Sequence, residues 1–261
     1  MTTIPAVAPP LPRDDPWKRH LSPAHAFKWL AAGWRDVAVH PTSSLIYGLL
    51  VSLVSATIVF GLFAIGWASV LFPAFAGFMV VGPLLAIGLY EKSRQIAAGE
   101  PVRLARMIFV RPKSGGQILF TGVLLCLLML LWMRAAVIIY ALFFGVRAFP
   151  GLDHIAPMLF TTPTGWTMLI VGGAVGALFA AFSFAISAFS IPMLLTERLD
   201  ALTAMGRSTA LVWNNLPVML TWGAIAFALF LLSLVTGLIG LIIVFPVLGH
   251  GTWHAYRAIW K

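Results

Sequence analysis

The chain has 261 residues, of which 61% are apolar and only 10% are charged, and its mean hydropathy is +0.97. A soluble protein carries roughly 25% charged residues, because a surface in water needs polar groups. The composition therefore excludes a soluble enzyme and a disordered regulator, and it predicts an integral membrane protein. Cys126 is the only cysteine, so an intrachain disulfide scaffold is excluded as well.

The net charge of +9 has two interpretations. A strongly basic protein can bind nucleic acid, but membrane proteins collect lysine and arginine in their cytoplasmic loops. We adopt the second interpretation and expect no nucleic-acid partner.

Residues 1–21 are predicted to form a disordered cytoplasmic tail, followed by a membrane domain over residues 22–261. The first twenty residues contain five prolines and charges of both signs. They lack the 7–15-residue apolar core of a signal peptide, so we expect the first span to act as the insertion signal.

Six stretches are long and apolar enough to be spans, since a bilayer core about 30 Å thick requires about 20 helical residues. They are residues 44–66, 68–90, part of 117–146, 166–195, 216–235 and 238–258. The last pair depends on dividing the uncharged stretch 217–249 and on including His250 to Tyr256 in the sixth span.

The orientation follows from the distribution of basic residues. With six spans and a cytoplasmic N-terminus, fifteen basic residues lie inside, Arg147 alone lies outside and Arg134 lies within a span. This asymmetry predicts that both termini are cytoplasmic.

Three segments that precede pairs of spans resemble one another. The first begins at Ser22-Pro23 and ends at His40-Pro41, and comparable segments occupy residues 102–109 and 199–213. In the first, the apolar residues recur at helical spacing: Ala24, Phe27, Leu30, Ala31, Trp34 and Val37. We predict an all-α polytopic membrane bundle of three helical hairpins, each preceded by a cytoplasmic amphipathic helix. Such repeats occur in transporters and also in structural membrane domains.

Arg134 is the one charge inside an apolar stretch. Arginine at a bilayer centre costs on the order of 3 kcal/mol. Counted from Ile118, however, Arg134 lies about 24 Å along the helix, roughly 6 Å from the outer boundary. It either snorkels or pairs within the bundle, or it contacts a substrate or a lipid headgroup.

Two groups of side chains could bind metal. His250 and His254 are four residues apart and therefore share a helical face, but one pair does not complete a zinc site. The alternative is a polar vestibule at the inner end of the sixth span. Cys126, Met129 and Met133 bring sulfur to one face of the third span, where ordinary packing is the alternative. We expect no metal or cofactor.

Small residues form a stripe on the fourth span, which ends with Ser183 and Ser187. Its members recur every three or four residues: Gly172, Gly176, Ala180, Ser183 and Ser187. Such a stripe lets two helices approach closely and is first a packing feature.

Acidic and basic residues follow the second and fourth spans. Glu91 and Arg94 lie after the second span, and Glu197 lies after the fourth. They predict either charge pairs that fix the repeats against each other or a solvated loop, in which such pairs stabilise by only about 0–1 kcal/mol.

No phosphate-binding glycine loop, nucleophile elbow or serine–histidine–carboxylate arrangement is discernible. Three segments instead resemble a known family: Gly88 to Glu100, Ile191 to Met205, and the closing Pro246 to Arg257. Together they are similar to the family called domain of unknown function 2189, over roughly residues 25–258.

This family consists of predicted integral membrane proteins without an established activity, some of which carry the label of cytochrome c oxidase subunits. The resemblance implies a bacterial inner membrane and at most an association with respiratory machinery. It directs attention to the matching positions: Glu91, Arg94, Pro246, His250, Trp253 and His254.

The leading functional prediction is a non-catalytic accessory, assembly or scaffold component of the bacterial inner membrane. Its expected partners are membrane lipids and a respiratory or other membrane complex. The alternative is a transporter or lipid-binding permease with Arg134, Ser183, Ser187 and His250 along a polar cavity between the repeats. A membrane metalloenzyme built on His250 and His254 is the third class.

Overall fold

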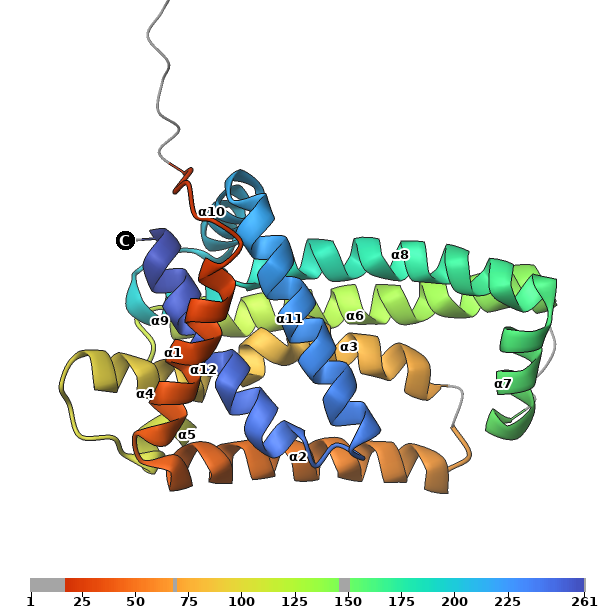
Figure 1. Cartoon of the computed structure of the whole chain (residues 1–261), viewed down its shortest axis with the longest axis horizontal. Coiled ribbons are helices and arrows are strands. Elements are labelled where there is room, and N and C mark those ends of the chain that lie inside the picture. Colours follow the sequence, from red (N-terminus) through yellow and green to blue (C-terminus); the bar gives the residue numbers. More distant parts are fainter. Residues whose placement is uncertain (1–16, 68–69, 146–150, 261) are drawn as a thin grey trace, which may run out of the picture.

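The computed structural model describes residues 17–67, 70–145 and 151–260, and every regular element in these ranges is a helix (Figure 1). Within them, four stretches are long and apolar enough to cross a membrane: Pro41–Ala64, Gly115–Phe144, Pro163–Thr196 and Leu216–Val235. The expectation of an all-helical membrane protein is confirmed at this level, while the count of six spans stays a prediction.

Helices α1 (His25–Ala38) and α2 (Pro41–Ala64) meet at the expected boundary. His40 lies between them with a φ of 52°, in the left-handed region. Pro41 opens α2 at a position where its fixed φ suits the helix and its missing N–H removes no hydrogen bond. The chain therefore turns sharply between α1 and α2.

The second expected span, 68–90, is divided into two helices in the described residues. Helix α3 (Leu71–Leu85) ends at Ala86, and α4 (Ile87–Ala97) continues towards the short helix α5 (Leu104–Ile108). Pro83 inside α3 removes one backbone donor and crowds the preceding turn, which weakens the helix just before it ends. Residues 68–69 lie outside the described ranges.

Helices α6 (Gly115–Phe144) and α8 (Pro163–Ser187) run beside each other, and α3 packs on both. Short helices flank them, α7 (Leu152–Thr161) before α8 and α9 (Ser190–Thr196) after it. A Cβ added to Gly176 would lie 3.0 Å from the Trp132 ring of α6, and one added to Gly172 would lie 3.8 Å from Ile139. These two members of the small-residue stripe therefore face α6, as the packing interpretation expects.

The chain ends with α10 (Ala201–Asn214), α11 (Leu216–Val235) and α12 (Leu241–Trp260). The turn between α11 and α12 contains Gly237 and Leu238, with φ values of 63° and 70°. Ser52 donates a hydrogen bond of 2.9 Å to the carbonyl oxygen of Leu238. Because Ser52 is the twelfth of the 24 residues of α2, this turn lies beside the middle of α2 and not beside its far end (Figure 1).

Helix α1 crosses α12 at very short range, because glycines stand at the crossing. A Cβ added to Gly33 would lie 2.4 Å from the carbonyl oxygen of Val247 and 2.7 Å from the backbone nitrogen of Gly251. Gly251 in turn fits beneath the ring of Trp222, which a Cβ would approach to 2.5 Å. The crossing therefore requires residues without a side chain at Gly33 and Gly251.

The packed face of α1 differs from the apolar stripe that the sequence singled out. The buried residues include Trp29, Gly33 and Asp36, whereas Phe27 and Trp34 are 59% and 55% exposed. The packed face is determined by the close approach of Gly33 to α12 and by the hydrogen bonds of Asp36. The hydrophobicity of the side chains alone therefore does not identify it. The two aromatic members of that stripe, Phe27 and Trp34, are left on the surface, whereas its last member, Val37, is buried.

The expected disordered tail needs a correction at its end. Arg19 donates its backbone N–H to Asn215 Oδ1 at 2.9 Å and its Nε–H to the carbonyl oxygen of Ile259 at 2.8 Å. Asn215 Nδ2 donates to the carbonyl oxygen of Trp17 at 2.8 Å. Residues 17–21 are thus held against α11 and α12 by contacts with distant residues, which local composition does not reveal. Residues 1–16 lie outside the described ranges.

Candidate functional site

Six polar side chains from four helices form one buried hydrogen-bonded cluster, which we call the buried polar network. Helix α1 contributes one of them, α2 one, and α4 and α12 two each. They are Asp36, Ser44, Lys92, Ser93, His250 and His254. The network lies where these four helices meet, at the end of the molecule that also carries α5 and α9 (left in Figure 1).

The hydrogen bonds of the network form a chain that begins at Lys92 and ends at Asp36. Lys92 Nζ donates to Ser44 Oγ at 2.8 Å and to the carbonyl oxygen of His40 at 3.1 Å. Ser44 Oγ lies 2.9 Å from His250 Nε2, and Ser93 Oγ lies 2.7 Å from His250 Nδ1. Ser93 donates to Asp36 Oδ2 at 2.6 Å.

The donors and acceptors fix the tautomer of His250. The proton of the Ser93 hydroxyl goes to Asp36, so Ser93 Oγ accepts a hydrogen bond from Nδ1–H of His250. This leaves Nε2 without a proton, as the acceptor for the hydroxyl of Ser44. A continuous series of donors therefore leads from the ammonium of Lys92 to the carboxylate of Asp36.

His254 joins the network at its more exposed end. Its Nε2 lies 2.9 Å from Asp36 Oδ2, and its side chain is 34% exposed. Ser44, Lys92 and His250, in contrast, are fully buried. Water can thus reach the His254 end, while the Lys92 end is covered by protein.

The two charges of the network have shifted pKa values. Burial lowers the pKa of Lys92 to about 8, although the carboxylate of Asp36 partly counteracts this effect. Burial would raise the pKa of Asp36, but hydrogen bonds from His254 and Ser93 outweigh it and hold that pKa below its ordinary value. Asp36 is therefore an anion at neutral pH, and Lys92 is a cation that loses its proton more readily than an exposed lysine.

This arrangement can move a proton among its members, but it offers little to a substrate or a metal. Ser44 has hydrogen-bond partners on two sides and no exposed surface. Both ring nitrogens of His250 are engaged by serines, so metal binding at His250 requires that one of these bonds breaks. No group of three or more His, Cys, Asp or Glu side chains that could hold a metal occurs in the described residues.

Glu91 and Arg94 form a second cluster on another face of α4. Arg94 binds Glu91 through two hydrogen bonds of 2.8 Å, and Arg106 of α5 approaches the same carboxylate to 3.6 Å. The hydrogen bond with Glu91 raises the pKa of Arg94 above its ordinary value. Glu91 is buried and Arg106 also binds Glu100 at 2.6 Å. The cluster thus ties α4 to α5.

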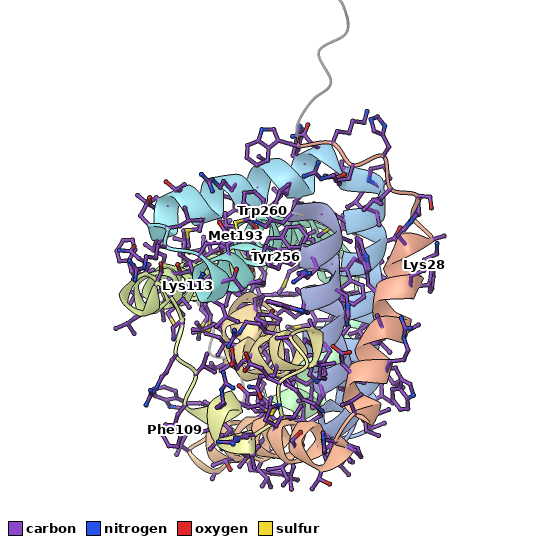
Figure 2. The ribbon with its side chains drawn as sticks, turned by 90° about the vertical axis from the view of Figure 1, so that its left-hand side faces the viewer. Lys28, Phe109, Lys113, Met193, Tyr256 and Trp260 are labelled. Atoms are coloured by element: carbon purple, nitrogen blue, oxygen red, sulfur yellow. The ribbon has the colours of Figure 1, made fainter. Side chains whose placement is uncertain are left out.

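Glu197 lies in a third place, near the C-terminal end of α12. Its carboxylate accepts a hydrogen bond of 2.6 Å from Trp260 Nε1, while the guanidinium of Arg207 lies 5.5 Å from the centre of the Trp260 ring. Tyr256 lies next to it, 3.0 Å from the hydroxyl of Thr196. Figure 2, which looks onto this end of the molecule, shows Met193, Tyr256 and Trp260 gathered there.

The structure does not bring Arg134, Ser183 and Ser187 together with His250. Arg134 is exposed on α6, whereas His250 is fully buried in α12. Ser183 and Ser187 are buried on α8; Ser183 lies 3.5 Å from the carbonyl oxygen of Val80, and Ser187 Oγ has no hydrogen-bond partner among the described residues. None of the four lines either of two cavities that the described residues form, one between α2 and α3 and one around Phe245, so the polar cavity between them stays a prediction.

An apolar groove of about 690 Å³ lies instead between α2 and α3, with walls from α6, α11 and α12. We call it the α2–α3 groove. Met129 and Met133 line it, while Cys126 is exposed, so the sulfur atoms do not face one another around a common point of coordination.

The sequence pointed to His250, His254, Glu91 and Arg94 but missed four members of the network: Asp36, Ser44, Lys92 and Ser93. One available signal was that Asp36 is the only acidic residue between positions 16 and 90. Lys92 and Ser93 directly follow Glu91, which was singled out. Ser44 carried no signal, because its partners come from the distant helices α4 and α12.

Comparison with known proteins supports the family resemblance. The family model described as "Predicted integral membrane protein (DUF2189)" matches residues 71–196. The resemblance to domain of unknown function 2189 is therefore confirmed, over a narrower range than residues 25–258. The matched range includes Glu91 and Arg94, but it ends before the closing motif with His250 and His254. No curated protein and no solved structure matches the chain significantly.

Proposed function

We propose that this integral membrane protein is a non-catalytic, multi-pass component of a bacterial inner membrane, with an accessory, assembly or scaffold role in a membrane complex. One observation carries the proposal: the side chains of the buried polar network are bonded to one another, and all but His254 are buried. Lys92, Ser44 and His250 have no exposed surface. The hydrogen bonds of the buried polar network join α1, α2, α4 and α12, as expected of a rigid support.

A network whose members bond to one another is better suited to fixing the arrangement of the helices than to catalysing the turnover of a substrate. Buried polar groups that satisfy one another specify a unique packing, whereas breaking one bond leaves a costly unpaired group. The network holds α1, which lies outside the apolar spans, firmly against α12. The same helix presents Phe27 and Trp34 to its surroundings.

Exposed aromatic residues at this end of the molecule supply surfaces for partners. Phe27 and Trp34 on α1, Phe109 after α5 and Trp213 on α10 are each more than half exposed. Exposed apolar patches mark contacts with proteins or with the membrane interface. We propose that this end faces the cytoplasm, which the concentration of basic residues in α1, α4, α5 and the loops beside them supports.

Affinity purification from native membranes in mild detergent tests the proposal. The wild-type protein is expected to recover a membrane complex in stoichiometric amount, and Trp34→Ala is expected to reduce that recovery. Phe160→Ala is the matched control, because Phe160 is 57% exposed on α7 at the other end of the bundle. Recovery of the protein alone, or equal recovery with both variants, would contradict the scaffold role.

A transporter or lipid-binding permease is the second candidate, favoured by the α2–α3 groove. The groove is lined almost entirely by apolar side chains, which suits a lipid rather than a polar solute. Lipid flipping or uptake by the protein in vesicles, absent from protein-free vesicles, would favour the permease over the scaffold.

A further inference from the structure

The α2–α3 groove follows α2 for most of its length. Its lining on α2 runs from Tyr47 to Leu62, which are fifteen helical steps apart and therefore separated by about 22 Å along the helix. This exceeds the roughly 15 Å of hydrocarbon that one leaflet contributes to a bilayer core. The groove is long enough to accept an acyl chain lying along α2.

The groove exists because α11 and α12 turn back beside the middle of α2. Helix α2 packs mainly on α12 and touches α3 little. Leu238 and Leu241, at the turn between α11 and α12, form one wall, and Met129 and Met133 of α6 form another. The space left between α2 and α3 is apolar and open, and its volume lies within the range of ligand sites, about 300–1,000 Å³.

Basic residues flank α5, the helix that lines the end of the groove near Tyr47. Tyr47, Leu85 and Ile108 line this end, and Ile108 is the last residue of α5. Residues 100–113, which contain α5, carry four basic residues and one acid, a net charge of +3. Arg103 precedes α5 and Arg111 follows Ile108 by three residues, and both are exposed.

We propose that the α2–α3 groove binds one acyl chain of an anionic phospholipid from the surrounding bilayer, with the headgroup held by Arg103 and Arg111. The apolar lining accepts the chain, and the exposed guanidinium groups can form paired hydrogen bonds with a phosphate. Arg106 is already engaged with Glu91 and Glu100. The inference does not depend on the scaffold proposal, since a bound lipid is compatible with either candidate function.

The chain site is tested by filling the groove. Ser55 lines the groove on α2, whereas Thr57, two residues later, is exposed and does not line it. Ser55→Trp and Thr57→Trp therefore place the same ring inside and outside the groove. Each purified protein is delipidated and supplied with phosphatidylglycerol or phosphatidylcholine, and bound lipid is counted by native mass spectrometry.

The wild-type protein and Thr57→Trp are expected to retain phosphatidylglycerol, and Ser55→Trp is expected to lose it. Equal retention by the two tryptophan variants would overturn the chain site. If Ser55→Trp does not fold, the wild-type protein decides, through a phosphatidylglycerol with a photoreactive acyl chain. Labelling on α2 and α3 residues of the groove supports the site, and labelling confined to other surfaces overturns it.

The headgroup site is tested with the double variant Arg103→Gln/Arg111→Gln, using Arg198→Gln as the control, since Arg198 is an exposed arginine in another loop. The double variant is expected to lose its preference for phosphatidylglycerol over phosphatidylcholine while still binding lipid. An unchanged preference, or none in the wild-type protein, would overturn the anionic headgroup. If a second copy of the chain fills the groove instead, Ser55→Trp converts dimers to monomers without changing bound lipid, and the proposal fails.

Discussion

The close crossing of α1 and α12 predicts a large difference between two glycine substitutions. Gly33 lies at the crossing, where a Cβ would come within 2.4 Å of a backbone oxygen of α12. Gly206 lies inside α10 and a Cβ there would meet nothing within 4 Å. Gly33→Leu and Gly206→Leu therefore add the same side chain to two helix interiors, one closed and one open.

The magnitudes follow from this geometry. Ordinary contact begins at 3.4 Å, so α1 and α12 must separate by about 1 Å to accommodate even a Cβ at Gly33. Overpacking of this kind lowers the free energy of unfolding by roughly 3 kcal/mol at its upper range. The better helix propensity of leucine than of glycine raises it by about 1 kcal/mol. The net loss of about 2 kcal/mol corresponds to a Tm lower by roughly 4–8 °C for a chain of this size. At Gly206 only the propensity term applies, so the Tm is expected to rise by about 2–4 °C.

Thermal unfolding in mild detergent, followed by tryptophan fluorescence, measures both changes. Separation of the helices also stretches the bond between Asp36 and His254, which is 2.9 Å in the native protein, and this adds to the loss at Gly33. If Gly33→Leu unfolds at the wild-type temperature, the close crossing of α1 and α12 is wrong.

Three further predictions concern the buried polar network and the topology. Because the pKa of Lys92 is lowered from 10.5 to about 8, the unfolded chain binds more protons between these pH values, and the free energy of unfolding rises with pH across that window. Thermal unfolding of the wild-type protein and of Lys92→Met at pH 7, 8.5 and 10 tests this rise, which the variant should lack; a parallel pH dependence would refute it. Ser93→Ala leaves Nδ1–H of buried His250 without its acceptor and is expected to cost about 1–3 kcal/mol, whereas Ser43→Ala, which removes only a bond to the nearby carbonyl oxygen of His40, should cost less; equal unfolding temperatures would contradict the network. Tags at the two chain ends are expected to be modified from the same side of the membrane, and modification from opposite sides would exclude an even number of crossings.

The sequence was sufficient for the helical membrane fold, because composition and apolar run length depend on local information alone. It also placed the boundary at His40-Pro41 correctly, since proline marks the first turn of a helix. It did not predict that the turn between α11 and α12 lies beside the middle of α2. That position depends on the contact between Ser52 and Leu238, which are 186 residues apart.

The candidate site was only partly predictable for the same reason. His250 and His254 stood out because a shared helical face follows from spacing. Their partners Ser44, Ser93 and Asp36 are common residue types on other helices, and only the packing of α1, α2 and α4 around α12 brings them together. The charged residues on α4 and after α9 were visible in the sequence, but the burial of Glu91 was not.

The turn between α11 and α12 lies beside the middle of α2. With the turn in this position, finding both chain ends on one side of the membrane does not determine how many times the chain crosses it. A re-entrant hairpin returns to the face from which it entered, and a hairpin that crosses the bilayer twice does the same. Both arrangements therefore place the C-terminus on the same side of the membrane. A cysteine introduced at Gly237 distinguishes the two. In a re-entrant hairpin it lies within hydrocarbon and stays shielded from a water-soluble maleimide on either face, whereas a full traverse exposes it on the face opposite the termini.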